Sequence, residues 1–115
     1  MYNFTDDTLK KIYGYILHNP DSDLKLKSIS TKFFLNQTYL SNLFSRKSNI
    51  RYSQLITNIK LKRAEYLITY EHKNIADVAI ELGYKDLSYF NKLYQKIIGV
   101  VPESYNQNDS FSYTI

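Results

Sequence analysis

Residues 75–84 of the chain read Ile-Ala-Asp-Val-Ala-Ile-Glu-Leu-Gly-Tyr, and this stretch decides the fold. Its apolar residues recur every three or four positions, which is the spacing of one helix face. Ala79 is small enough to let a second helix cross closely, and Gly83 gives the backbone the freedom that a sharp turn needs. The stretch therefore predicts a short helix, a turn at Gly83 and a second helix after it.

A second copy of this unit lies earlier in the chain. Residues 39–47 (Tyr-Leu-Ser-Asn-Leu-Phe-Ser-Arg-Lys) match residues 89–97 (Tyr-Phe-Asn-Lys-Leu-Tyr-Gln-Lys-Ile) at an offset of 50 positions, and residues 29–30 match residues 78–79 at an offset of 49. The one-residue difference falls in the expected turn, where insertions are tolerated. An Ala-x3-Gly match alone is common in helical hairpins, but a duplicated frame at matched spacing is much more specific.

The first copy departs from the second at its turn. Ser30 takes the position of Ala79, and a serine is still small enough for the helix contact. Phe34 takes the position of Gly83. A bulky residue is strained in the left-handed conformation that glycine adopts easily. We therefore expect the first turn to differ in geometry from the second.

Helical periodicity continues over most of the chain, beginning with a helix whose N-cap we expect to be Thr5. The sequence predicts an all-α fold of about seven helices, in which a long linker helix joins two helix-turn-helix subdomains of homeodomain-like form. The expected helices cover residues 6–18, 27–34, 37–47, 52–70, 75–82, 87–98 and 102–105. The expected divisions are a first subdomain over residues 1–50, the linker helix over 51–72, a second subdomain over 73–106 and a flexible tail over 107–115.

The positive charge of the chain is concentrated in one segment. The formal net charge is +4, but residues 24–64 contain nine lysines and arginines and no carboxylate, whereas acids outnumber bases on both sides. A basic segment of this kind indicates an anionic partner and is typical of nucleic-acid-binding domains. The alternative is a solvated basic surface that binds nothing.

Residues 75–92 and the closing segment 99–105 (Gly-Val-Val-Pro-Glu-Ser-Tyr) resemble the second helix-turn-helix and the Gly-x-x-Pro-x-x-Tyr signature of the AraC/XylS-type transcription regulators. The resemblance extends from about Thr8 to Tyr105 and is looser in the first half, where Asn49 replaces a usual glycine. It implies sequence-specific binding of double-stranded DNA by two recognition helices in successive major grooves. It also implies that the chain is the output domain of a larger regulator, with RNA polymerase and a sensor or receiver domain as further partners.

The residues that face DNA follow from the two recognition helices, because the outward side chains near their N-termini meet the base edges. We expect Tyr39 and Tyr89 to point inward with the apolar residues beside them. The expected base-contacting residues are Gln37, Thr38, Ser41 and Asn42 in the first unit, and Leu87, Ser88, Asn91 and Lys92 in the second. The expected phosphate-contacting residues are Lys32, Arg46, Lys47, Arg51 and Lys85. Solvation alone is the alternative for Ser41 and Ser88, and a helix-dipole role is the alternative for Arg46 and Lys47.

Other classes of protein fit the composition poorly. The chain has no cysteine, which removes disulfides and thiolate chemistry and fits a cytoplasmic protein. Its two histidines, His18 and His72, fall at expected helix ends, and it contains no glycine-rich phosphate loop. We therefore expect no enzymatic activity, no cofactor, no metal site and no membrane segment.

The main alternative function is a helix-turn-helix module that binds another protein. The chain contains 12 tyrosines, and tyrosine-rich surfaces are typical of protein interfaces. Salt separates the two hypotheses, because binding to phosphates weakens steeply with salt while an apolar protein interface hardly responds. RNA suits the paired helices less well, since the A-form major groove is too deep and narrow for them.

Overall fold

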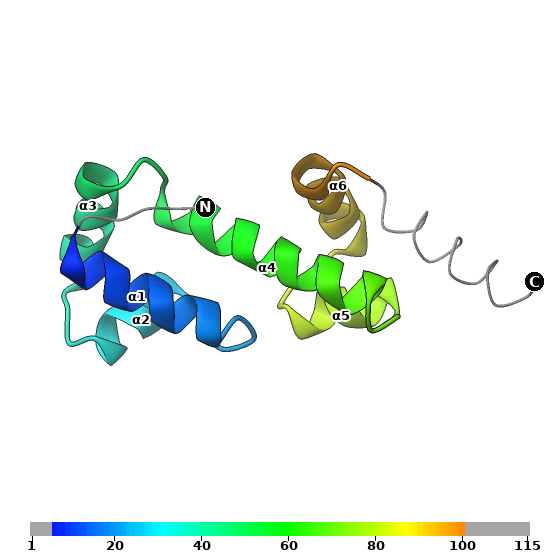
Figure 1. Cartoon of the computed structure of the whole chain (residues 1–115), viewed down its shortest axis with the longest axis horizontal. Helices are drawn as coiled ribbons and strands as arrows, with labels where there is room; N and C mark the ends of the chain where they lie inside the picture. The colour runs from blue at the N-terminus through cyan, green and yellow to red at the C-terminus, as the bar shows by residue number, and fades with distance from the viewer. Residues whose placement is uncertain (1–5, 101–115) are drawn as a thin grey trace, which may run out of the picture. The chain divides into compact units, whose positions relative to one another are not determined.

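The computed structural model describes residues 6–100 of the chain, which form six α-helices and no strand (Figure 1). The helices are α1 (Asp7–His18), α2 (Leu26–Lys32), α3 (Gln37–Lys47), α4 (Tyr52–Thr69), α5 (Ile75–Glu81) and α6 (Leu87–Ile98). The expectation of an all-α fold is confirmed, and each helix ends within two residues of its predicted bounds. The expected helix over 102–105 and the expected tail over 107–115 lie outside the described residues.

Four of the helices, α1, α3, α5 and α6, begin at polar residues whose side chains cap them. The side chains of Asn36, Asn74 and Asp86 each accept a hydrogen bond from a backbone N–H in the first turn of α3, α5 and α6. The prediction for α1 is wrong, because Asp6 and not Thr5 is its N-cap. The carboxylate of Asp6 accepts a 3.1 Å hydrogen bond from the backbone of α1. Its negative charge also interacts favourably with the positive end of the helix dipole, whereas the hydroxyl of a threonine carries no charge.

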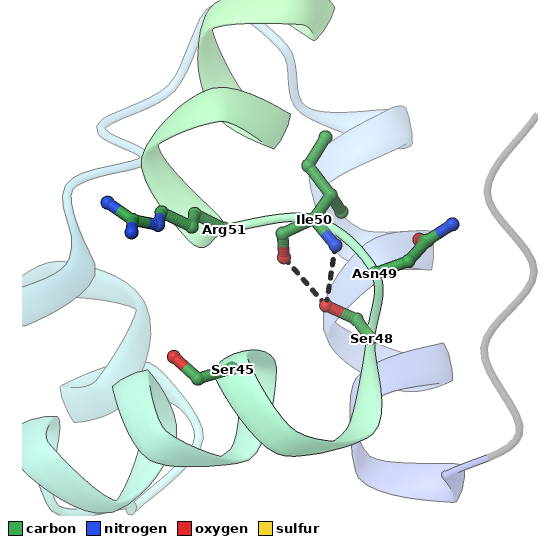
Figure 2. A pocket seen from close by; sticks show the side chains of 5 residues that line it. All are labelled: Ser45, Ser48, Asn49, Ile50 and Arg51. Carbon is green, nitrogen blue, oxygen red and sulfur yellow. Dashed lines mark hydrogen bonds between the residues drawn. The ribbon is translucent and has the colours of Figure 1, made fainter.

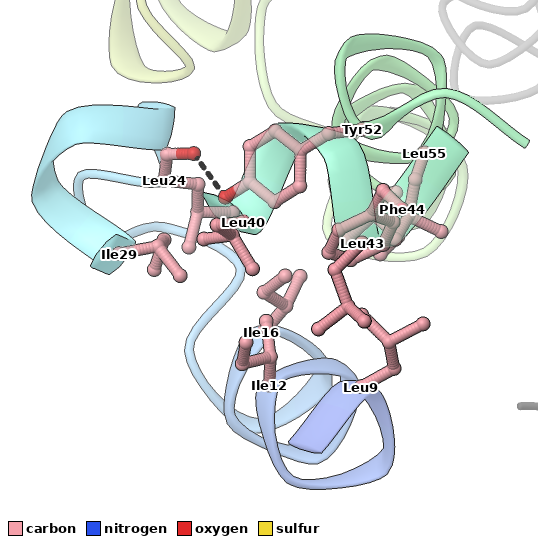
Figure 3. Close-up of a cluster of buried hydrophobic side chains, with 11 residues drawn as sticks. Leu9, Ile12, Ile16, Leu24, Ile29, Leu40, Leu43, Phe44, Tyr52 and Leu55 are labelled. Atoms are coloured by element: carbon pink, nitrogen blue, oxygen red, sulfur yellow. Dashed lines mark hydrogen bonds between the residues drawn. The ribbon is translucent and has the colours of Figure 1, made fainter. Parts of the chain in front are cut away.

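The chain divides into two compact units, Met1–Ile59 (unit 1) and Lys60–Ile115 (unit 2), and the boundary falls inside α4. In unit 1 the N-terminal half of α4 contributes to a core shared with the first three helices. The buried residues of this core are Leu9, Ile12, Ile16, Leu24, Ile29, Leu40, Leu43, Phe44, Tyr52, Leu55 and Ile59. Figure 3 shows that the Tyr52 hydroxyl donates a hydrogen bond, 2.6 Å long, to the backbone carbonyl of Leu24. This bond ties the start of α4 to the segment that precedes α2.

Unit 2 repeats this arrangement with the C-terminal half of α4 in the role of α1. The two helices bury residues at identical spacing, namely Leu9, Ile12 and Ile16 in α1 and Leu61, Ala64 and Ile68 in α4. The other buried residues of unit 2 are Leu67, Ile75, Val78, Ala79, Leu82, Phe90 and Tyr94. The repeat is therefore a three-helix unit, of which the sequence comparison detects only the last two helices. One continuous helix, α4, serves both cores (Figure 1).

The turns of the two helix-turn-helix units have the same geometry, so the expectation of a different first turn is wrong. After α2, the N–H groups of Phe34 and Leu35 donate to the carbonyls three and five residues earlier, at 3.2 and 2.8 Å. After α5, those of Gly83 and Tyr84 do the same at 3.0 and 2.8 Å. Both are Schellman motifs with a left-handed central residue, whose φ is 57° at Phe34 and 92° at Gly83. Burial of α2 against α3 overrides the local preference of Phe34.

Candidate nucleic-acid interface

The recognition helix of unit 1, α3, turns one side to the core and the other to solvent. Leu40, Leu43 and Phe44 are buried, which fixes the rotation of the helix about its axis. The opposite surface carries the side chains predicted to contact bases, of which Gln37, Thr38 and Asn42 are exposed and Ser41 is half-buried. These side chains lie in the first two turns of α3, which is where a recognition helix meets the base edges.

The recognition helix of unit 2, α6, is held in the same way. Phe90 and Tyr94 are fully buried and anchor the helix in the core. The predicted base-contacting residues lie on the outer surface, with Leu87, Ser88 and Lys92 exposed and Asn91 half-buried. The two helices therefore present outward side chains at matching positions, in keeping with the 50-residue repeat.

Tyr39 and Tyr89 do not point inward as predicted. They occupy matching positions in the first turns of α3 and α6, and 48% and 55% of their surfaces are exposed. Successive helix residues are about 100° apart, so when Leu40 and Phe90 face the core the preceding tyrosines lie on the flank of the helix. Each tyrosine therefore borders the surface that carries the predicted base contacts.

Two more outward residues belong to these surfaces and are absent from the prediction. Ser45 and Gln95 are exposed and lie at matching positions, one turn beyond Asn42 and Lys92. The Ser45 hydroxyl also donates to the carbonyl of the preceding turn at 3.2 Å. Their spacing of three residues from Asn42 and Lys92 predicts that they share the same helix surface. The spacing identifies that surface only when the buried side of each helix is known.

Exposed basic residues flank the C-terminal end of α3. Arg46 and Lys47 lie in its last turn, and Arg51 lies immediately before α4. None of the three forms an ion pair with another residue of the part of the chain that the structure describes. Their charges are therefore available to an external anion. Phosphate contacts at these positions stay a prediction.

A shallow pocket opens beside these bases. It has a volume of about 340 Å³ and is lined by Ser45, Ser48, Asn49, Ile50 and Arg51 (Figure 2). The Ser48 hydroxyl shapes its wall, since it lies 2.6 Å from the carbonyl oxygen of Phe44 and 2.7 Å from that of Ile50. It also accepts the N–H of Ile50 at 3.3 Å. These bonds hold the connection between α3 and α4 in one conformation and thereby position Arg51.

The other two predicted phosphate ligands differ in their surroundings. Lys32 is exposed at the end of α2, and its Nζ lies 4.8 Å from the centre of the Tyr15 ring. The cation–π contact limits the freedom of the lysine and leaves its charge at the surface. Lys85 is exposed next to the cap of α6 and forms no ion pair within residues 6–100.

The two units differ in how their charges are balanced. In unit 2, Lys62 lies 3.6 Å from a carboxylate oxygen of Glu65, and Lys73 lies 3.7 Å from one of Glu81. In unit 1, residues 24–59 belong to the segment that contains no carboxylate, and their lysines and arginines form no ion pair within the described residues. The basic surface of unit 1 is therefore less neutralised by neighbouring carboxylates than that of unit 2.

Residues 6–100 contain no cluster of metal-ligating side chains. No three His, Asp or Glu side chains among them gather in a way that could hold a metal ion. Burial, with a smaller effect of Asp23, raises the pKa of Tyr52, whose hydroxyl is already engaged by Leu24. That tyrosine is thus a structural group. No helix in the described part of the chain has both the length and the apolar character needed to cross a membrane.

Comparison with known proteins places these features in a family. A family model described as a helix-turn-helix domain matches residues 29–108. The regulatory protein PocR of Salmonella typhimurium is 28% identical over 102 residues, which are 89% of this chain and 34% of that protein. A probable AraC family transcriptional regulator from Rhodopseudomonas palustris has the same fold, with a TM-score of 0.76, 15% identity and coverage of 90% of this chain and 97% of that one. The chain belongs to the AraC/XylS family. The prediction of an AraC-type helix-turn-helix DNA-binding domain is thereby confirmed.

Two further solved structures have the same fold. The C-terminal domain of AraT, a response regulator from Geobacillus stearothermophilus, is 25% identical, has a TM-score of 0.75 and covers 90% of this chain and 86% of its own. The DNA-binding domain of AdpA, a global transcriptional factor solved in complex with a target DNA, has a TM-score of 0.73 at 13% identity, with coverage of 90% and 93%. The chain spans about a third of the length of the curated relatives it matches.

Proposed function

We propose that this AraC/XylS-family domain binds double-stranded DNA sequence-specifically by placing the N-terminal halves of α3 and α6 in successive major grooves. The observation that carries the proposal is the structural repeat. Each unit holds a capped recognition helix behind an identical turn and buries matching residues, so that matching side chains face outward. The AdpA domain, which shares this fold, was solved on its target DNA and supports the same use of the fold here.

The outward side chains suit base recognition. Gln37 and Asn42 can each make two hydrogen bonds to adenine, and the methyl group of Thr38 can pack on the methyl group of thymine. In α6, Lys92 can reach guanine or a phosphate. The remaining proposed base contacts come from Ser41, Leu87, Ser88 and Asn91, at positions that match or adjoin these.

Unit 1 supplies most of the affinity in this proposal, and unit 2 adjusts specificity. Four of the five proposed phosphate ligands, Lys32, Arg46, Lys47 and Arg51, belong to unit 1, and Lys85 alone belongs to unit 2. Neutralising about five phosphates releases their counterions, so the logarithm of the binding constant should fall with the logarithm of salt concentration at a slope of about −4 to −5.

Fluorescence anisotropy on randomised and selection-enriched duplexes, repeated across a salt series, tests the proposal. We expect a steep salt dependence and enriched sites with two half-sites about 10 base pairs apart. Asn42→Ala should relax the sequence preference, whereas Tyr70→Ala, which removes an exposed side chain outside both helix-turn-helix units, should leave binding unchanged. Binding that does not respond to salt, or no binding to any duplex, would overturn the proposal.

A protein partner is the second candidate function, and one surface favours it. At the C-terminal end of α4, the rings of Tyr66 and of Tyr70, the residue that follows the helix, lie 5.6 Å apart, and the Arg63 guanidinium lies 5.5 Å from the Tyr66 ring centre. Both tyrosines are exposed, and tyrosine is enriched at protein interfaces. Because the curated relatives are about three times as long as this chain, we propose a sensor or receiver domain and RNA polymerase as such partners. We propose the cytoplasm as the location, because transcription takes place there.

A further inference from the structure

The turn of unit 1 holds a side chain that folding does not explain. Phe34 has a φ of 57° and is 94% exposed. In unit 2, Gly83 makes the same turn with the same two backbone hydrogen bonds and without the strain of a Cβ atom. An aromatic ring at this position contributes almost nothing to the core, and its left-handed backbone opposes folding. The ring therefore serves something outside the folded chain.

The position of Phe34 relates it to the recognition helix. It precedes Asn36, the N-cap of α3, by two residues, and Gln37 opens the helix. Three residues of chain span at most about 11 Å, so Phe34 lies within that distance of the first proposed base contact. The major groove of B-DNA is about 12 Å wide. When the start of α3 lies in the groove, the exposed ring is within reach of the groove wall.

The surroundings of Phe34 match a nucleic acid better than a protein. No carboxylate occurs between residues 24 and 64, and the nearest charged side chain in the sequence is Lys32. The turn is also firmly held, since Tyr15 packs edge-on against Phe33, with ring centres 5.8 Å apart, and receives the Lys32 ammonium on its face. A firmly held turn that exposes an apolar ring next to a surface cation complements a sugar-phosphate strand, in which apolar deoxyribose edges alternate with phosphates.

We propose that Phe34 is a DNA-contacting residue whose ring packs against the deoxyribose wall of the major groove beside the bases read by α3. The inference rests on the proposed DNA-binding function. It also assigns a role to the strain, because a left-handed Phe34 projects its ring from the turn instead of burying it. Unit 2, with glycine at the same position, lacks this contact.

Two substitutions separate the effect of the Phe34 ring on DNA binding from the effect of its left-handed backbone on stability. Phe34→Ala removes the ring and keeps a Cβ atom on the left-handed backbone, whereas Phe34→Gly removes both. On a selection-enriched duplex we expect both variants to bind about five- to tenfold more weakly, a change of about 1–1.4 kcal/mol. Only Phe34→Gly should raise the melting temperature, by about 4 °C. Ile80→Ala, which removes an exposed apolar side chain of α5 outside both recognition helices, is the control and should change neither quantity much.

The outcomes distinguish this inference from the proposed function. If the wild-type chain binds the duplex with steep salt dependence and both Phe34 variants bind equally well, the DNA contact is wrong and the proposed function stands. If Phe34→Gly weakens binding and also lowers the melting temperature, the turn needs the ring for folding and the inference is again overturned. If the wild-type chain binds no duplex, both proposals fail together.

Discussion

Unit 1 and unit 2 share one architecture and carry different surfaces. Both place a recognition helix behind a Schellman turn, and both bury a large side chain at the same two helix positions, Leu40 and Phe44 in one and Phe90 and Tyr94 in the other. Outside the core they diverge, because no lysine or arginine of unit 1 forms an ion pair within the described residues, whereas unit 2 pairs two of its lysines with glutamates. The comparison shows that the buried residues are constrained by the shared architecture, whereas the charged residues on the surface can differ between the two units.

The same comparison shows how a polar residue can replace an apolar one in the core. Ser30 stands in the position of Ala79, at the close contact between the two helices of the unit, and is almost fully buried. Its hydroxyl donates to the carbonyl of Lys27 at 2.9 Å, within its own helix. A buried polar group that is hydrogen-bonded costs little. The first unit therefore accommodates a buried serine at this position.

The largest effect should come from truncating matching core residues. Phe44→Ala and Tyr94→Ala should each lower the free energy of unfolding by about 3–5 kcal/mol, because each removes a fully buried aromatic side chain. Chemical denaturation followed by circular dichroism measures both losses. If one variant lost less than about 1 kcal/mol, its unit would contribute little to the cooperative fold, and the equivalence of the two cores would be broken.

The next effect concerns the charge difference between the units. Replacing Arg46 and Lys47 together by glutamine should weaken DNA binding more than tenfold and reduce the salt slope by about 2. A double variant in unit 2, Lys92→Gln with Lys96→Gln, of which only Lys96 matches a substituted position of unit 1, should lose less affinity. Anisotropy titrations at several salt concentrations provide both numbers. Equal losses in the two units would contradict the proposal that unit 1 supplies most of the affinity.

A smaller effect should follow from removing the Tyr52 hydroxyl. Tyr52→Phe should cost about 1–2 kcal/mol of stability, because the Leu24 carbonyl loses a buried 2.6 Å hydrogen bond. At the offset of 50 residues, the matching position in unit 2 is Pro102, which has no hydroxyl. The hydrogen bond from a tyrosine hydroxyl at this position is thus specific to unit 1. Thermal unfolding of the variant beside the wild-type chain measures it, and an unchanged melting temperature would argue against it.

The pKa of Tyr52 adds a pH dependence to this difference. Burial raises the pKa in the folded chain, whereas in the unfolded chain the phenol ionises near pH 10. Above about pH 10 the unfolded state therefore binds fewer protons than the folded state, and stability falls as the pH rises. Below that pH the stabilising contribution is fully present. Tyr52→Phe should flatten the alkaline side of a stability profile, and a parallel decline in both proteins would refute this origin.

The smallest effects should come from the helix caps. Asn36→Ala and Asp86→Ala remove side-chain acceptors at the start of α3 and α6, so each should cost about 1 kcal/mol. The loss at Asp86 should be slightly larger, because its carboxylate also interacts with the helix dipole. Denaturation midpoints measure both losses. Asp86→Asn, which keeps an acceptor and removes the charge, separates the two contributions.

Much of the fold could be predicted from the sequence because its signals are local. Cap residues such as Asn74 and Asp86 and the apolar spacing between them place the helices almost to the residue. The geometry of the Phe34 turn could not be predicted, since the contact between α2 and α3 decides it against the preference of the residue itself. The equivalence of α1 and the second half of α4 could not be detected in the sequence, because the two segments share only the spacing of three buried residues.

The candidate site was predictable to a similar degree and for a similar reason. Thr38, Asn42 and their partners follow from helical spacing once the recognition helix is located, and they do lie on the outer surface. The flanking tyrosines, Tyr39 and Tyr89, were assigned to the wrong side. An aromatic residue at the border of an apolar stripe can pack or project, and the rotation of the helix in its core decides which.

The shared helix α4 also sets where this chain can be recombined with others. Ile59 and Leu61 are two positions apart in one helix, yet they belong to different cores. A chimera that joins its parents in the loop before Tyr52 or after Thr69 would mix core residues from two proteins in at least one half. A junction between Ile59 and Lys60 keeps each half with its own packing partners. Exchange of DNA specificity between relatives therefore calls for a splice in the middle of a helix, where engineers seldom cut.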